Sequence, residues 1–242
     1  MDQPGTSSIQ VSGIKVEIVH KDIKNLHLSV LPPNGRVRVS VPLHVSKDRV
    51  RAAVSTRLPW IRRQQRDFAN QPRQSERDMA TGETHFFEGK RYRLEVIERY
   101  GKHEVTCKGN RLRLFVRPGT TTSNRQKVLT RWYRERLSSR IPILIDRWQS
   151  KIGVKANGWG IKKMKTKWGS CNTSSKRIWL NRDLACKPKL CLEYIVVHEL
   201  VHLLERTHND AFRAYMDKFM PNWRLHRDLL NNSPLGNEQW KY

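Results

Sequence analysis

The sequence has few acidic residues for its length. Its 242 residues include 22 aspartates and glutamates against 47 lysines and arginines, which leaves a formal net charge of +25. A field of this sign attracts nucleic acid, nucleotides and acidic proteins, although it says nothing about the fold. The alternative is a solvated surface that like charge keeps in solution. Both interpretations remain open, and association with nucleic acid through the basic surface is one form of the first.

Cysteines are few as well, and long apolar runs are missing. The four cysteines contain no C-x-x-C pair and follow no regular spacing, so the sequence predicts neither a disulfide scaffold nor a cysteine zinc site. No apolar run approaches the length of a membrane span, and the first ten residues lack the basic and apolar regions of a secretory signal. We therefore expect reduced thiols, a cytoplasmic location and no membrane association.

The first third of the chain alternates apolar and polar residues. The alternation runs from Ile9 to Pro42, and a turn signal at residues 32–35 divides it, which predicts an antiparallel hairpin or meander. A helical pattern with an expected bend at Pro59 begins at Ser46. Residues 70–81 are polar and charged, so we expect a surface connection there.

No internal repeat is recognisable in the rest of the chain. Strand-like alternation resumes between Phe86 and Pro118, and a long helical pattern begins at Thr122 or Ser123, with an interruption or kink expected at Pro142. Two more candidate strands, GIKKMKTKW and RIWLN, precede a last group of helical segments. These patterns predict an α+β fold with an antiparallel β-rich N-terminal lobe, holding one helix, over residues 1–120 and a second lobe over residues 121–242.

The segment HELVHLLERTH, residues 198–208, concentrates three histidines and two glutamates. On a helix, residues four apart differ by about 40° around the axis, so His198 and His202 point the same way. Glu199 lies on the adjoining part of the face, where its carboxylate can approach a water molecule at the metal without being a ligand. The H-E-x-x-H pattern is thus typical of two zinc ligands and a general base. The flanking residues are apolar, so these polar groups would be buried and would need a partner such as a metal.

A catalytic zinc takes a third protein ligand, and His208 is the leading candidate. If the helix ran straight on, His208 would lie about 9 Å along the axis from His202 and about 240° around it, facing away. The helix must therefore end near Glu205 or Arg206 and turn back.

The sequence permits such a turn. Thr207 and Asn209 are residues of the N-cap type, and they precede an amphipathic helical pattern, DAFRAYMDKFM. No glutamate follows before residue 231, so the alternative ligands are Asp210 and Asp217.

These residues resemble the YgjP-like metal-dependent hydrolases, a branch of the zincin-type minimal metallopeptidases related to the SprT-like and WLM groups. The resemblance implies a zincin-like catalytic lobe whose active-site helix carries HExxH, and it assigns the third ligand to His208. Serine usually follows that histidine in the family, and Asn209 keeps its capping chemistry. The residues that carry the resemblance are residues 168–171 (WGSC), 177–181 (RIWLN) and 194–202 (YIVVHELVH), then His208 with Phe212, and Pro221, Trp223, Arg227 and Leu230.

Zincins bind an extended substrate along an edge strand above the active-site helix, by strand addition. The stretch IKKMKTKWGSC is the candidate for this edge or its adjoining loop. Its lysines would line the cleft, or they serve only to protect an edge strand from aggregation. The candidate substrate-binding residues are Lys165, Lys167, Trp168 and Ser170, with Lys162 and Lys163 beside them.

Three functions remain open at this point. The first is a metallopeptidase with one Zn²⁺ per chain, or another divalent cation, and Glu199 as general base. The second is a metal-dependent nucleoside-triphosphate pyrophosphohydrolase acting on UTP-like substrates, since members of the resembled family have been assigned to both classes. The third is a nucleic-acid-associated protein with a structural zinc, for which charge is the only motive. The expected partners are accordingly a peptide or protein substrate, or a nucleotide.

Overall fold

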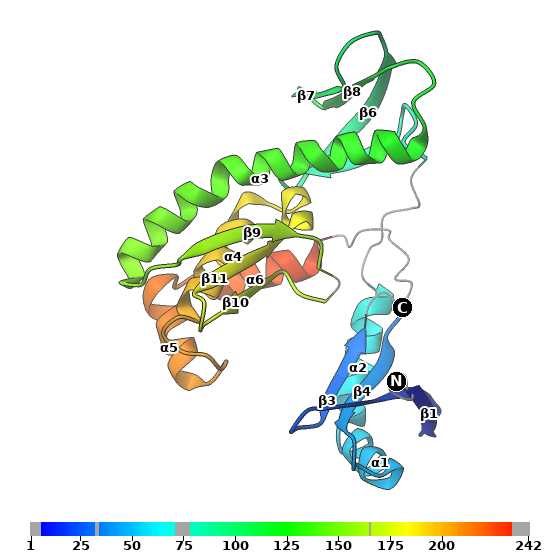
Figure 1. The fold of residues 1–242 in the computed structure, drawn as a ribbon, viewed down its shortest axis with the longest axis vertical. Helices are drawn as coiled ribbons and strands as arrows, with labels where there is room; N and C mark the ends of the chain where they lie inside the picture. The colour runs from blue at the N-terminus through cyan, green and yellow to red at the C-terminus, as the bar shows by residue number, and fades with distance from the viewer. Residues whose placement is uncertain (1–5, 32–33, 71–77, 165, 234–242) are drawn as a thin grey trace. The chain divides into compact units, whose positions relative to one another are not determined.

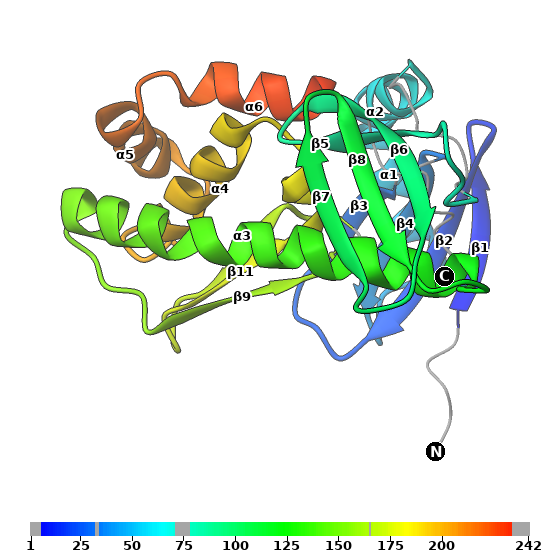
Figure 2. The same ribbon diagram turned by 90° about the horizontal axis from the view of Figure 1, so that it is seen from above.

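The computed structural model describes residues 6–31, 34–70, 78–164 and 166–233 (Figures 1 and 2). The chain divides into two compact units, whose described parts are residues 6–70 and 78–233. Each unit has a hydrophobic core of its own. None of the described helices combines the length and the apolar character that crossing a bilayer requires.

The first unit is a four-stranded sheet followed by two helices. The strands β1 (Thr6–Val11), β2 (Ile14–Lys21), β3 (His27–Leu31) and β4 (Arg36–Pro42) lie in the order β1-β2-β4-β3. Two antiparallel hairpins, β1-β2 and β3-β4, join through a parallel pairing of β2 with β4. The sheet is therefore mixed, and the prediction of an antiparallel lobe was wrong. Alternation marks the face that each residue occupies, but it is the same in parallel and antiparallel pairs.

The helices of this unit close one core. Ser46 caps α1 (Lys47–Thr56) by accepting a hydrogen bond from the Arg49 amide, and α2 (Leu58–Asn70) begins one residue before Pro59, where the bend was expected. Proline fits the first turn of a helix because no amide donor is required there. The core is built almost entirely from β-branched residues: Val11, Val16, Ile18, Val37, Val39, Val41, Val50, Val54 and Ile61.

The second unit begins with a sheet of the same design. The strands β5 (Thr84–Phe87), β6 (Lys90–Glu98), β7 (Glu104–Lys108) and β8 (Arg111–Val116) lie in the order β5-β6-β8-β7, again with a parallel central pair. Helix α3 (Thr122–Ile152) follows and runs unbroken through Pro142. The sheet packs across α3 (Figure 2). The boundary expected between residues 120 and 121 consequently falls inside this unit.

The remaining elements surround one buried helix. A three-stranded mixed sheet has the order β10-β11-β9, from β9 (Gly158–Lys162), β10 (Gly169–Asn172) and β11 (Arg177–Asn181). A 3-10 turn, Arg182–Cys186, leads into α4 (Lys189–Val201), and α5 (Asp210–Phe219) and α6 (Trp223–Asn232) complete the unit. Helix α4 contacts α3, α5, α6, β10 and β11 (Figure 1). The fold is α+β, with three mixed sheets and six α-helices in the described residues.

Candidate metal centre

Helix α4 carries the first part of the site. It is apolar on nearly every side, and Val196, Val197, Leu200 and Val201 are fully buried. A helix with apolar residues all round lies inside a protein, so the polar side chains on it are enclosed as well. His198 is half-buried and Glu199 keeps only 4% of its surface exposed. Both therefore need partners within the molecule or a ligand.

The chain turns back directly after α4, as the position of His208 requires. The helix ends at Val201, and the amides of Leu204 and Glu205 bond to the Val201 carbonyl in a tightened last turn. The Glu205 carboxylate then accepts hydrogen bonds from the amide and the hydroxyl of Thr207, both at 3.0 Å.

The next helix starts at once, because Asn209 caps α5 by accepting from the Phe212 amide at 2.9 Å. Two local capping motifs thus place His208 beside α4. Ring contacts hold the result in place, since Phe212 packs with centroids 5.0 Å from His198, 4.7 Å from His202 and 4.8 Å from His208.

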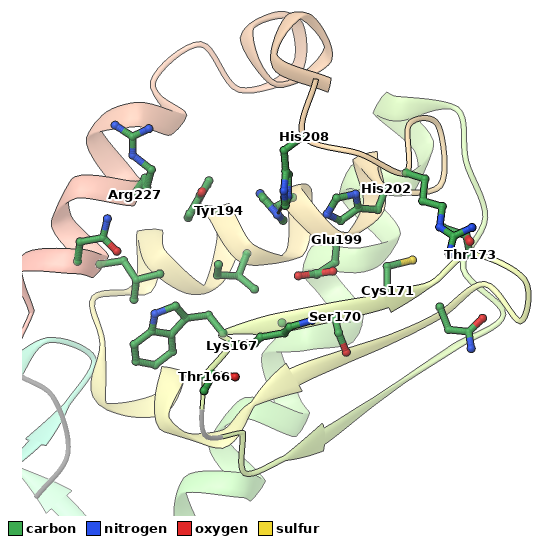
Figure 3. A pocket seen from close by; sticks show the side chains of 18 of the residues that line it. Thr166, Lys167, Ser170, Cys171, Thr173, Tyr194, Glu199, His202, His208 and Arg227 are labelled. Carbon is green, nitrogen blue, oxygen red and sulfur yellow. Dashed lines mark hydrogen bonds between the residues drawn. The ribbon is translucent and has the colours of Figure 1, made fainter. Parts of the chain in front are cut away.

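The structure brings the three histidines together, and Figure 3 shows His208 beside His202. One possible ligand atom from each of them lies within 4.8 Å of the others, and the Nε2 atoms of His198 and His208 are 3.0 Å apart. In the described residues, neither alternative aspartate belongs to this cluster. Asp210 pairs with Arg213, while Asp217 accepts from Trp223 and Arg224. Both are thus engaged elsewhere.

The electrostatics of the cluster favour a metal. Burial, reinforced by the neighbouring imidazoles, lowers the pKa of His198 to about 3. Burial also lowers the pKa values of His202 and His208. Neutral imidazole is the form that binds zinc. The Nδ1 atom of His202 lies 3.1 Å from the Glu205 carbonyl, and this contact leaves Nε2 for a metal when Nδ1 carries the proton. Three neutral nitrogen donors with an open side fit a catalytic zinc better than a structural one.

Glu199 lies beside the cluster, in contact with strand β10. Burial raises the pKa of this carboxyl to about 8, and the charge of Lys167 opposes the shift. Its Oε2 atom is buried and has no hydrogen-bond partner among the described residues. A Cβ atom at Gly169 would lie 2.8 Å from the Glu199 Cγ, so only glycine lets β10 approach the carboxylate this closely. An unpaired buried carboxylate at this position is typical of a group that works on a ligand.

A cleft of about 720 Å³ opens over these residues (Figure 3). Of the predicted substrate-binding residues, Lys167, Trp168 and Ser170 line it. The three histidines of the cluster and Glu199 line it as well. Lys165 lies outside the described residues, and the ammonium of Lys162 lies over the Trp179 ring, 4.7 Å from its centroid. Tyr194, Arg206 and Arg227 are among the other residues that line the cleft. Tyr194 precedes His198 by one helical turn, so helical spacing could have identified it.

Comparison with known proteins supports the same assignment. The sequence matches a family model described as YgjP-like, metallopeptidase domain, over residues 24–233. Among solved structures, the metallopeptidase zymogen of Pyrococcus abyssi abylysin is 21% identical, and the match covers 37% of this chain and 87% of that chain with a TM-score of 0.33. That likeness is too small to support an argument about this chain. None of the curated proteins matches the sequence of this chain. Because the family model spans most of the sequence and includes the whole histidine cluster, the chain belongs to the YgjP-like metallopeptidase domain family.

Proposed function

We propose that the protein is a zinc-dependent metallopeptidase in which His198, His202 and His208 hold one Zn²⁺ and Glu199 is the general base. The observation that carries the proposal is the pairing of three neutral imidazoles with a buried, unpartnered carboxylate under an open cleft. A bound zinc ion supplies Lewis acidity, which lowers the pKa of water to about 7 and polarises the substrate carbonyl. We propose equally that the lobe that carries HExxH is zincin-like.

The residues of the chain would divide the remaining work. The Glu199 carboxylate takes one proton from water while the water oxygen forms a bond to the carbonyl carbon of the scissile peptide. The same carboxyl then passes that proton to the leaving nitrogen as the C–N bond breaks, which yields a carboxylic acid and an amine. The acid then gives its proton to the amine, so the products are a carboxylate and an ammonium group. Its raised pKa suits both halves of this exchange, since a catalytic acid–base works best with a pKa near the operating pH.

The substrate would lie along β10. This strand pairs only with β11 among the described strands, so one of its edges is open to an added strand. A Cβ at Gly169 would lie within 2.9 Å of the Glu199 side chain, so β10 passes close to the proposed general base, which supports this position for the substrate. An extended peptide is therefore the ligand that the edge fits best.

The substitution Glu199→Gln tests the proposal. We expect zinc content to stay at one ion per chain, measured by elemental analysis, while hydrolysis of a peptide panel falls by about 10²- to 10⁴-fold. Glu193→Gln is the matched control on the same helix, because the Glu193 carboxylate accepts hydrogen bonds from Arg147 and Trp148 instead. Zinc-dependent turnover retained in Glu199→Gln would reject the role of Glu199. His208→Ala should lose the metal.

A nucleotide pyrophosphohydrolase is the second candidate, on the evidence of the cleft's charge. Lys167 and Arg206 line the cleft, and neither makes an ion pair among the described residues. Free cations of this kind suit phosphate groups. An assay of pyrophosphate release from the four ribonucleoside triphosphates separates this reaction from peptide cleavage.

A structural zinc is the weakest candidate, because such sites are closed by four protein ligands whereas the described cluster has three and opens to a cleft.

A further inference from the structure

The loop between β9 and β10 is tied down at Lys167. Asn181, the last residue of β11, is 4% exposed and donates two hydrogen bonds of 2.9 Å from its side-chain amide, to the carbonyls of Met164 and Lys167. Its own backbone amide donates to the Trp168 carbonyl at 2.8 Å. A single residue, through its side chain and its backbone amide, therefore fixes the backbone on both sides of the lysine. The backbone position of Lys167 is built into the fold.

The Lys167 side chain extends toward the metal centre. Figure 3 shows it reaching along the cleft toward Glu199, below the histidines. It lines the cleft together with Glu199, His202 and His208. Arg206 and Arg227 are the other lysine or arginine side chains that line the cleft in the described residues. Lys167 is thus a cleft cation whose side chain is directed toward the reacting groups.

This arrangement is unfavourable unless it serves the reaction. A lysine close to a site for a divalent cation repels the metal. Among the described residues Lys167 forms no ion pair, and Glu199 is the only acid that lines the cleft. Arg227, by contrast, pairs with Asp228 and covers the Trp223 ring. A repulsive cation on an anchored backbone, with no ion-pair partner among the described residues, points to a negative charge that arises only during turnover.

We propose that Lys167 is a catalytic residue whose ammonium stabilises the negative charge that develops on the carbonyl oxygen of the scissile peptide, and that Asn181 is its positioning residue. The inference rests on the proposed peptidase function. A donor directed at developing charge acts mainly in the transition state, because the neutral carbonyl of the bound peptide gains little from it. Loss of the ammonium should therefore lower kcat and leave KM nearly unchanged.

The test compares Lys167→Gln with Lys167→Arg, and uses Lys151→Gln on α3 as a control that removes one positive charge from the same unit. In Lys167→Gln we expect kcat to fall by about 10²- to 10³-fold, with KM within a factor of about three. Zinc content should stay at one ion per chain, and Lys167→Arg should recover part of the rate. Lys151→Gln should match the wild type.

A binding measurement provides a readout that does not depend on turnover. A phosphinic peptide carries a charged tetrahedral group in place of the scissile amide, so its Kd for Lys167→Gln should weaken by about the factor lost in kcat. Its Kd for Lys151→Gln should not change. Unchanged kcat and phosphinate affinity in Lys167→Gln would overturn the inference, as would loss of zinc in parallel with the rate. If the zinc-loaded wild type cleaves no peptide, the proposed function itself fails, which is a different result.

Asn181→Ala separates positioning from general damage. If Asn181 acts through Lys167, its substitution should lower kcat in the wild-type background and have little further effect in Lys167→Gln. Equal losses in both backgrounds would show that Asn181 supports only the fold.

Discussion

The two four-stranded sheets are built alike in detail. In the first sheet Val16 pairs with Val37 and Ile18 with Val39, and in the second Leu94 pairs with Leu112 and Val96 with Leu114. The first hairpin of each sheet turns through a positive-φ pair, with φ of 48° and 81° at Ser12-Gly13 and of 51° and 80° at Glu88-Gly89. The helix after each sheet is capped by a hydroxyl, from Ser46 and from Thr121.

The difference between them lies in what covers the sheet. The first sheet is closed by α1 and α2 around a small core of its own. Beneath the second sheet, α3 continues for 31 residues, and the residues of β6 and β8 share one continuous core with α4, which carries the HExxH segment. The same design therefore forms a self-contained unit in one place and supports the candidate metal centre in the other. Damage to the second sheet should reach the metal centre, whereas damage to the first should not.

The largest contrast is expected from matched core truncations. Val39 and Leu114 occupy equivalent positions, and both are fully buried. Leu114→Ala should cost about 2–5 kcal/mol of unfolding free energy, and Val39→Ala about 2 kcal/mol for its two lost methyl groups. Calorimetry with and without zinc identifies the unfolding transition of the second unit, because ligand binding raises its midpoint temperature. Leu114→Ala should lower the midpoint of that transition, and Val39→Ala should lower the midpoint of the other. A shift of the same transition by both variants would contradict the comparison.

A buried lysine gives the two units different responses to pH. Lys187 is 4% exposed, donates to the Ser233 carbonyl and lies over Trp168, and burial lowers its pKa from 10.5 to about 8. Between these two values the unfolded chain holds more protons than the folded one, so stability rises with pH. From pH 8 to 10.5, the unfolding free energy of the second unit should therefore rise by about 3 kcal/mol more in the wild type than in Lys187→Met.

The first unit serves as the internal control for this titration. Its described core contains no buried cation, so its transition should be the same in wild type and Lys187→Met at every pH. A pH-independent difference between the two proteins in the unfolding transition of the second unit would show that Lys187 does not titrate in this range.

The smallest contrast concerns the two hairpin glycines. Gly13 and Gly89 have nearly equal φ, 81° and 80°, so alanine is strained equally at both, at a cost of about 1 kcal/mol. A Cβ at Gly13 meets nothing within 4 Å, but at Gly89 it would lie 3.0 Å from the Pro188 Cα, just before α4. Gly89→Ala should therefore cost about 1–2 kcal/mol more than Gly13→Ala. Equal losses in denaturant unfolding would mean that the contact with Pro188 is easily relieved.

Sequence patterns located the elements better than they predicted the pairing. Alternation marked the strands between Ile9 and Pro118, but the parallel central pairs depend on contacts between segments that are distant in the chain, and these leave no local trace. The similarity of the two sheets was hidden for the same reason, since their residues differ while their registers agree.

The site was more predictable than the fold, because its geometry is local. Helical spacing aligned His198 with His202, and the capping residues after Val201 explain how His208 reaches them. The backbone position of Lys167 could not be foreseen, because its carbonyl is bonded by Asn181, a polar residue at the end of an apolar strand some 14 positions later. The hydrogen bonds of Asn181 form only when folding brings β11 next to the loop before β10.

The open edge of β10 determines what such an enzyme could digest. The strand is four residues long, and recognition along it would use main-chain amides. Compact proteins already use those amides in their own helices and sheets. Cleavage would then fall on flexible or unravelled segments and spare intact neighbours. The choice of target would reflect the conformational state of a protein more than its composition.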